Sequence, residues 1–290
     1  MDDGEVFQGG VNEVVREGDR VGRPAGPWSP TVQRLLGHLR DAGFTGAPRP
    51  YGFGERGGNG ADGGADGDRA GGGAGGDGGA GAAAGNGVAG GDGVREFVEF
   101  LPGEVGHDFS APYCRSDPSL AAMGRLLRAF HDATAGFPRR PDDVWHLPPR
   151  EPAEVICHGD AATYNTVFRE GLPVALIDFD TAHPAPRVWD AAYTAYRFVP
   201  LYAPDETALT LPVAEALRRL RLFADAYGLT DGQRAELPAV AAERLRTLVA
   251  HMRAQAAAGH PAFARHLAEG HHRRYLTDAR WIEENFTGRL

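Results

Sequence analysis

A glycine-rich segment at residues 57–93 limits what this chain can fold into more than any other feature. About half of its residues are glycine and none is aromatic. Such a segment cannot bury enough apolar surface to offset the entropy lost when a chain becomes ordered. We therefore expect a disordered loop. Because the entropic cost of closing a loop grows slowly with its length, this loop can connect two paired strands.

The sequence on either side of this segment indicates an α+β protein with two lobes. Two short β-branched runs, VNEVV and DRVGR, flank Gly18 and predict a hairpin. Residues 29–43 predict a helix, with Ser29 as its cap and Pro30 in its first turn. Residues 94–101 predict a further strand. We expect residues 1–101 to form a small antiparallel sheet with one helix, and residues 102–290 a mainly helical lobe. Its helical patterns begin at Asp117 and recur at 213–227, 235–258 and 271–286.

Composition excludes several classes of protein. The formal net charge of −9 argues against a nucleic-acid binder, which would present a basic face. The chain has no run of 18 apolar residues and no apolar segment near its start, so we expect a cytoplasmic protein without a membrane partner. Its two cysteines, Cys114 and Cys157, do not suggest a disulfide scaffold, and Cys157 is expected to be buried. The oligomeric state is not predicted.

Polar residues that could take part in catalysis or metal binding are concentrated in residues 154–193. The apolar run EVIC immediately precedes His158-Gly159-Asp160. Asn165 lies five residues after Asp160. Two short strands, TVF and PVALI, then form a hairpin that can return Asp178 to the neighbourhood of Asn165. Two carboxylates and one amide are oxygen ligands of the kind that Mg²⁺ prefers. Phosphoryl transfer needs such a metal ion and a carboxylate that orients the attacking hydroxyl.

This segment resembles the active site of the aminoglycoside phosphotransferase family, part of the protein-kinase-like superfamily. The family's H-G-D-x-x-x-x-N loop reads here from His158 to Asn165, and its I-D-x-x segment reads Ile177-Asp178-Phe179-Asp180. The resemblance implies that Asp160 is the catalytic base and that His158 supports its loop. It implies Asn165 and Asp178 as Mg²⁺ ligands. Asp180 is either a second metal contact or a turn residue.

The same resemblance implies further roles outside the catalytic loop. Asp190, in WDAAY, matches an aspartate that begins a helix and hydrogen-bonds back to that loop. ATP is the implied cofactor, with its adenine on backbone groups near Glu99 and Leu101. The turn in FQGGVNEVV resembles the turn that covers the nucleotide. Its residues near the phosphates would be Gly9, Gly10 and Asn12, although glycines here also fit a simple turn.

The chain departs from the superfamily where the phosphates would be held. All 30 of its basic Lys-plus-Arg residues are arginine, so the usual lysine on the third strand is absent. Arg23 occupies the expected position, with Arg16 as the other candidate. An arginine is larger and forked, so the exchange is not conservative. The helix offers Gln33 where an acidic partner for that cation is expected.

These features favour an ATP- and Mg²⁺-dependent phosphotransferase acting on a hydroxyl of a small molecule. The missing lysine leaves a second hypothesis, a degenerate kinase-like protein that binds nucleotide or a partner without turnover. A third is a hydrolase, because VALIDFDTA resembles the D-x-D-x-T motif of haloacid-dehalogenase-like phosphatases. Its late position in the chain and the absent lysine argue against it. Acids after Asp190 are candidates for holding an aminoglycoside-like amine, although the fold also serves other alcohols and sugars. They are Asp205, Asp225, Glu283 and Glu284.

Overall fold

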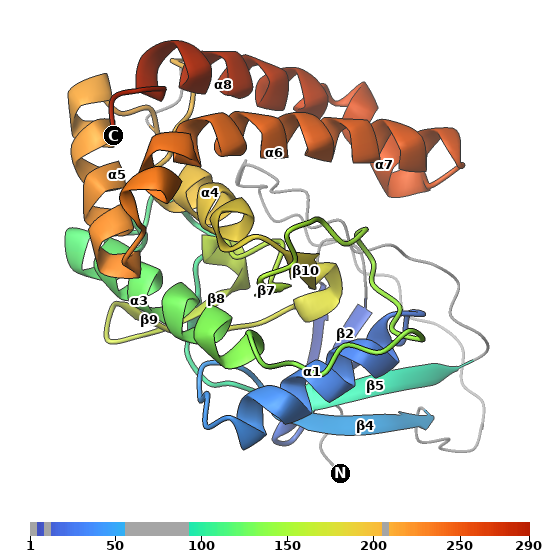
Figure 1. Cartoon of the computed structure of the whole chain (residues 1–290). Helices are drawn as coiled ribbons and strands as arrows, with labels where there is room; N and C mark the ends of the chain where they lie inside the picture. Colours follow the sequence, from blue (N-terminus) through green and yellow to red (C-terminus); the bar gives the residue numbers. More distant parts are fainter. Residues whose placement is uncertain (1–4, 9–12, 56–92, 205–208) are drawn as a thin grey trace, which may run out of the picture.

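The computed structural model describes residues 5–8, 13–55, 93–204 and 209–290. Its N-terminal part is a five-stranded antiparallel sheet in the order β1-β2-β3-β5-β4, with helix α1 packed beside β4 (Figure 1). The strands are β1 (Glu5–Gln8), β2 (Glu13–Glu17), β3 (Arg20–Pro24), β4 (Pro50–Glu55) and β5 (Val94–Glu99), and the helix is α1 (Ser29–Asp41).

The local predictions for this part are confirmed except for one helix cap. β2 and β3 form the expected hairpin around Gly18, which adopts a left-handed φ of 66°. β4 and β5 are antiparallel neighbours, so the glycine-rich stretch does connect two paired strands. The prediction that Ser29 caps α1 was wrong. Trp28 stands at the cap, and Ser29 is the first helical residue, where its hydroxyl accepts a hydrogen bond from the Gly26 N–H.

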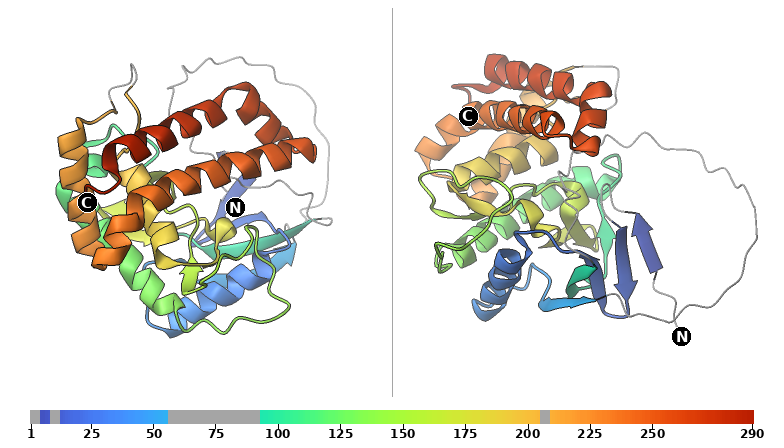
Figure 2. Two further views of the ribbon diagram at one scale, coloured as in Figure 1. Left: turned by 45° about the horizontal axis from the view of Figure 1, so that its top comes forward. Right: turned by 90° about the vertical axis from the view of Figure 1, so that its right-hand side faces the viewer.

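The C-terminal part is mainly helical, as expected, and α6 and α8 lie side by side at the end of the molecule remote from the sheet (Figures 1 and 2). A capping box between Thr230 and Gln233 starts α6 four residues earlier than the periodicity predicts. Among the described residues, no helix is both long and apolar enough to cross a bilayer. The helices are α2 (Pro112–Arg115), α3 (Asp117–Thr134), α4 (Arg187–Phe198), α5 (Val213–Tyr227), α6 (Asp231–Ala257), α7 (Pro261–Ala268) and α8 (His271–Phe286).

Two small sheets lie between the five-stranded sheet and the helices. In one, β7 (Val155–Cys157) pairs with β10 (His183–Ala185). In the other, β8 (Thr166–Arg169) pairs with β6 (Glu104–Val105) and β9 (Leu172–Leu176). The polar segment singled out in the sequence runs through strands of both sheets and into α4, so hydrogen-bonded strands flank its loops.

One hydrophobic core supports this segment from both sides. It joins Leu35 of α1, Phe130 of α3 and Phe179, all at least 98% buried. Cys157 is buried and free, as predicted, and so is Cys114. Burial of this much apolar surface is the main favourable term in folding, and here it fixes the sheet, the polar segment and the helices relative to one another.

Candidate active site

The loop that carries Asp160 follows β7 and turns sharply at Gly159. Gly159 has a φ of 82°, and a Cβ added there would lie 2.4 Å from the carbonyl oxygen of Thr181. Only glycine fits such a position without strain. His158, fully buried, has its Nε2 3.0 Å from the carbonyl oxygen of Ile177. This contact ties the loop to the residue before Asp178, which is what a supporting histidine would do.

Asp160 lies in a polar pocket made by the residues that follow it. The Asn165 amide donates to Oδ2 of Asp160 and to its backbone carbonyl, both at 3.0 Å. The Tyr164 hydroxyl donates to Oδ1 at 2.6 Å. Burial raises the pKa of Asp160 to about 7, although the hydrogen bond from Tyr164 opposes this shift. A carboxyl group with a pKa near neutrality is suited to accept a proton at physiological pH. Sequence reasoning missed Tyr164.

Asp178 sits at a strained position between β9 and a short 3-10 turn, Phe179–Thr181. Its φ of 63° and ψ of 69° are left-handed, which is uncommon outside glycine and concentrates at functional sites. The Ile177 N–H donates to the Asn165 carbonyl at 2.9 Å, so the hairpin does return this segment to Asn165. The Asp178 charge also helps raise the pKa of Asp160. The two carboxyl groups are therefore electrostatically coupled.

Arg23 reaches from β3 of the sheet to the polar segment. Its guanidinium donates to Asp178 Oδ1 and to Asp180 Oδ1, both at 2.5 Å, and its Nε donates to Glu96 Oε1 at 2.7 Å. Burial raises the pKa of Asp180 despite the neighbouring guanidinium. Arg16, the other candidate, instead stacks on Phe100 at 3.8 Å. Of the two arginines, Arg23 is the one beside the predicted metal ligands.

Glu96 is a site residue that sequence reasoning missed. The expected acidic partner was sought on α1, but it comes from β5, directly opposite Arg23 in the sheet register. Its side chain is 1% exposed. Gln33 of α1 donates to the backbone carbonyl of Phe97 and makes a longer contact, 3.4 Å, with Glu96. The one available signal was an acid at an inward-facing position of an apolar strand, next to Phe97.

The predicted nucleotide contacts are only partly within the described residues. The backbone N–H of Glu99 donates to the Arg49 carbonyl at 2.9 Å, so this donor is already used within the sheet. Leu101 lies in the link between β5 and β6 and is half-buried. Their role at adenine stays a prediction. The remaining three predicted contacts, Gly9, Gly10 and Asn12, lie outside the described residues.

Asp190, in the first turn of α4, holds the backbone of the catalytic loop. It accepts hydrogen bonds from the N–H groups of His158, at 2.7 Å, and Gly159, at 3.0 Å. Burial alone would raise the pKa of Asp190, but the hydrogen bond with His131 and the neighbouring charges lower it to about 2. His131 also contacts the Tyr227 hydroxyl at 2.6 Å. His131 therefore orients Asp190.

Replacing Asp190 is expected to destabilise the whole protein. Asp190→Ala leaves two buried N–H groups and one imidazole without their acceptor, so the free energy of unfolding should fall by about 3 kcal/mol or more. Urea denaturation measures this change. Asp132→Ala, at an exposed position of α3, is the control and should cost less than about 1 kcal/mol. Equal stabilities for the two variants would contradict the role assigned to Asp190.

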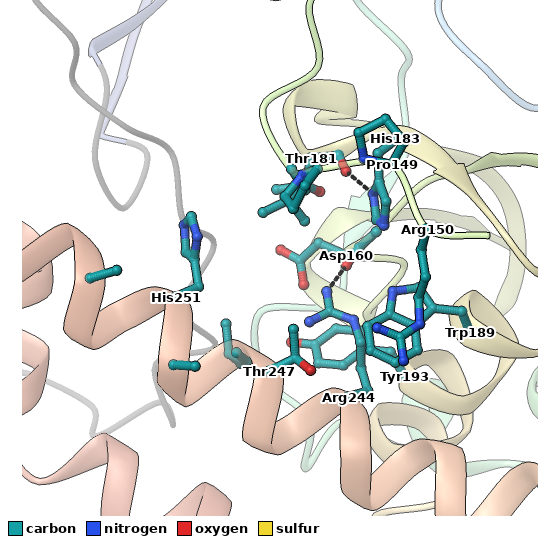
Figure 3. Close-up of a pocket in the computed structure, with 16 residues that line it drawn as sticks. Pro149, Arg150, Asp160, Thr181, His183, Trp189, Tyr193, Arg244, Thr247 and His251 are labelled. Carbon is teal, nitrogen blue, oxygen red and sulfur yellow. Dashed lines mark hydrogen bonds between the residues drawn. The ribbon is translucent and has the colours of Figure 1, made fainter. Parts of the chain in front are cut away.

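A cavity of about 400 Å³ opens beside Asp160 (Figure 3). Its walls come from residues 147–150, from Gly159 and Asp160, from Thr181 and His183, and from α4 and α6. Its size is typical of small-molecule sites. Its lining is mainly apolar and aromatic, with a few polar groups among it. The residues that later arguments use are Arg150, His183, Trp189, Tyr193, Arg244 and His251. Asp160 thus lines this cavity, and its pKa also responds to the charge of Asp178, which belongs to the cluster formed by Arg23, Asp178 and Asp180.

His183, in the cavity wall, should make stability depend on pH. Burial lowers the pKa of His183 to about 4, against 6.5 for a free imidazole. Between these values the unfolded chain binds a proton that the folded chain does not, so stability falls as the pH is lowered through this window. From pH 7 to pH 5 the loss due to His183 should be about 2 kcal/mol. Denaturation of wild type and His183→Asn at both pH values checks this; an identical loss in both proteins would contradict it.

Comparison with known proteins assigns this chain to a family. Residues 142–223 match the phosphotransferase enzyme family. The trifolitoxin immunity protein of Rhizobium leguminosarum bv. trifolii is 32% identical over 234 residues, which cover 78% of this chain and 74% of the relative.

Solved structures with a similar fold are kinases of small molecules. An amicoumacin kinase aligns with 98% of this chain and 89% of its own, at a TM-score of 0.63 and 12% identity. A choline/ethanolamine kinase family protein from Mesorhizobium loti aligns with 97% of this chain and 93% of its own, at a TM-score of 0.52 and 16% identity. The two-lobed α+β architecture is therefore the protein-kinase-like fold, and the chain belongs to the phosphotransferase enzyme family, together with the aminoglycoside phosphotransferases and related kinases.

Proposed function

We propose that this protein transfers the γ-phosphoryl group of Mg-ATP to a hydroxyl group of a small molecule. One observation carries the proposal: Asp160, 5% exposed and with a pKa raised by burial to about 7, lines a small-molecule cavity and is electrostatically coupled to Asp178. A carboxylate in that position can orient an acceptor hydroxyl and take its proton.

The oxygen donors beside Asp160 fit a hard divalent cation. Asn165 donates its amide nitrogen to Asp160, which directs its oxygen elsewhere, and Asp178 keeps a carboxylate oxygen that no protein group contacts among the described residues. These two residues would hold Mg²⁺, with Asp180 as a further ligand, and the ion would neutralise charge on the transferred phosphoryl group. The amicoumacin kinase structure holds AMP-PNP and Ca²⁺, which supports a nucleotide and a divalent ion here.

Arg23 and Glu96 would take the place of the missing lysine and its helix acid. Glu96 anchors the Nε of Arg23, so the two terminal nitrogens of the guanidinium remain directed at Asp178 and Asp180. When a metal ion binds these carboxylates, the same two nitrogens can turn to the nucleotide phosphates, which a guanidinium binds in a bidentate manner. The presence of this pair favours the hypothesis that the protein turns over its substrate rather than only binding nucleotide.

The similarity to the trifolitoxin immunity protein favours one setting for this reaction. At 32% identity over most of both chains, the two proteins share more than a fold. We propose that the acceptor is a toxic hydroxyl compound, and that phosphorylation makes the producing or neighbouring cell immune to it. An immunity protein that only sequesters its toxin is the alternative without turnover.

Incubation with ATP labelled in its γ-phosphate separates these functions. The protein is incubated with MgCl₂ and a panel of hydroxyl compounds, and labelled products are identified by mass spectrometry. Transfer of label to one acceptor supports a phosphotransferase. Binding of nucleotide or acceptor in calorimetry without any transfer supports sequestration, and phosphate release into water without an acceptor would support a hydrolase.

A further inference from the structure

The cavity beside Asp160 has the wrong charge for a polyamine. Among the described residues that line it, Asp160 is the one acid and Arg150 and Arg244 are the cations, while burial lowers the pKa of both histidines, His183 and His251. A bound polycation would need several carboxylates to replace its lost hydration. The apolar walls, formed by residues 147–149 and the ring of Trp189, offer no such groups.

The acids that could have bound an amine are engaged or lie elsewhere. Asp225 pairs with Arg234 at 2.6 Å, and Glu283 forms a two-point ion pair with Arg246. Glu284 does not line the cavity, and Asp205 lies outside the described residues. The expectation of an aminoglycoside-like acceptor therefore finds no support in the described residues.

Arg244 is a buried cation of this cavity that pairs with no carboxylate among the described residues. Its side chain comes from α6 and is 5% exposed, and one terminal nitrogen donates to the Gly159 carbonyl at 2.7 Å. Its Nε is buried without a hydrogen-bond partner, and no carboxylate among the described residues forms an ion pair with it. The rings of Tyr193 and Trp189, at 4.9 and 5.4 Å, stabilise the cation only in part. A buried cation without a counter-ion is costly.

We propose that the acceptor is a hydroxy acid with an apolar or aromatic body: its carboxylate binds Arg244, and its hydroxyl faces Asp160. This inference rests on the proposed function, because it names the substrate class of the same site. Arg244 donates to the carbonyl of Gly159, the residue before Asp160, and Figure 3 shows Arg244 and Asp160 in the same part of the cavity. An acceptor that reaches both groups must therefore carry its hydroxyl and its carboxylate only a few bonds apart.

The apolar part of such an acceptor has a place in the same cavity. Trp189 and residues 147–149 form an apolar surface next to Arg244, and His251 lies on the opposite side of the cavity (Figure 3). The Nε2 of His251 is buried without a hydrogen-bond partner among the described residues. Burial lowers the pKa of His251, so it is neutral at pH 7 and offers one further hydrogen bond to a polar substituent.

The test compares three probes in calorimetry without ATP: 3-phenyllactate, its neutral amide 3-phenyllactamide, and the polycation kanamycin. We expect 3-phenyllactate to bind about tenfold or more tightly than the amide, because a hydrogen-bonded ion pair with Arg244 is lost in the amide. Kanamycin should not bind. Equal binding of acid and amide, tighter binding of kanamycin, or no binding of 3-phenyllactate would each overturn the proposal.

Variants of Arg244 show whether this residue binds the carboxylate of the acceptor or only supports the loop at Gly159. Arg244→Gln should abolish the preference for acid over amide, and Arg244→Lys should retain part of it. If Arg244 only supported Gly159, both variants would weaken acid and amide equally. Arg246→Gln is the control, since Arg246 pairs with Glu283 and does not line the cavity. Should Arg244→Gln fail to fold, the comparison of the three probes in the wild-type protein still tests the proposal. If the protein preferred the acid but transferred no phosphoryl group, the proposed phosphotransferase function would be refuted, while the proposed ligand class would stand.

Discussion

Asp160→Asn is expected to lower kcat for phosphoryl transfer by about 10³-fold and to leave the affinity for nucleotide nearly unchanged. The asparagine keeps a carbonyl oxygen for the hydrogen bond from Tyr164 or Asn165, so the loop retains a partner, but it cannot accept the hydroxyl proton. General base catalysis contributes about 10²- to 10⁴-fold to such reactions. Initial rates over a range of acceptor concentrations, with nucleotide binding measured by calorimetry, check both parts.

The control for this variant is Asp132→Asn, which changes a carboxylate on the exposed part of α3. It should retain wild-type kcat. If Asp160→Asn transferred phosphate at the wild-type rate, Asp160 could not be the base. If it lost nucleotide binding as well, the side chain would be a ligand of the nucleotide or its metal ion rather than a proton acceptor.

Arg23→Met is expected to have the largest effect on stability. It removes the cation between three carboxylates, of which Glu96 is 1% exposed and cannot regain water without unfolding of the strand. Removing one partner of a buried ion pair costs about 3–5 kcal/mol. The free energy of unfolding, measured by urea denaturation, should fall by that amount, and the affinity for Mg-ATP should fall with it.

Two further variants show whether the charge or the shape of Arg23 matters. Arg23→Lys restores a cation but cannot hold three carboxylates with one planar group, so it should recover only part of the loss. In Arg23→Met, the additional change Glu96→Gln should cost little, because the partner of Glu96 is already gone. Arg20→Met, at an exposed arginine of the same strand, is the control. An Arg23→Met protein as stable as the control would contradict this account of the cluster.

The sequence was sufficient to predict those parts of the candidate site that are built from residues close together in the chain. The loop from His158 to Asn165 and the hairpin that returns Asp178 are local, and strand pairing and turn residues predict them well. The role of Asp190 was implied by the family resemblance rather than by local sequence, because it lies more than 30 residues after the loop whose N–H groups it accepts from. The boundary between lobes near residues 101 and 102 stays a prediction, as do the roles of Glu99 and Leu101.

The rest depends on residues that the chain brings together over long distances. Glu96 meets Arg23 only because β5 pairs with β3, and 73 residues separate the two side chains in the sequence, so sequence reasoning does not give that register. The cavity joins residues of the polar segment to residues 147–150, α4 and α6, and these parts carry no shared sequence pattern. Arg244 reads in the sequence as one polar position in a long helix, and its lack of a counter-ion becomes visible only in three dimensions.

Calorimetric titration of wild type and Asp178→Asn with the ATP analogue AMP-PNP, each with and without Mg²⁺, tests the central claim most directly. That claim is that Asp160, Asn165 and Asp178 form one site for a metal ion and a nucleotide. We predict that Mg²⁺ strengthens nucleotide binding to wild type by about tenfold or more and has much less effect on Asp178→Asn, because one carboxylate ligand is lost. Equal strengthening by Mg²⁺ in both proteins, or no nucleotide binding to wild type at all, would contradict it.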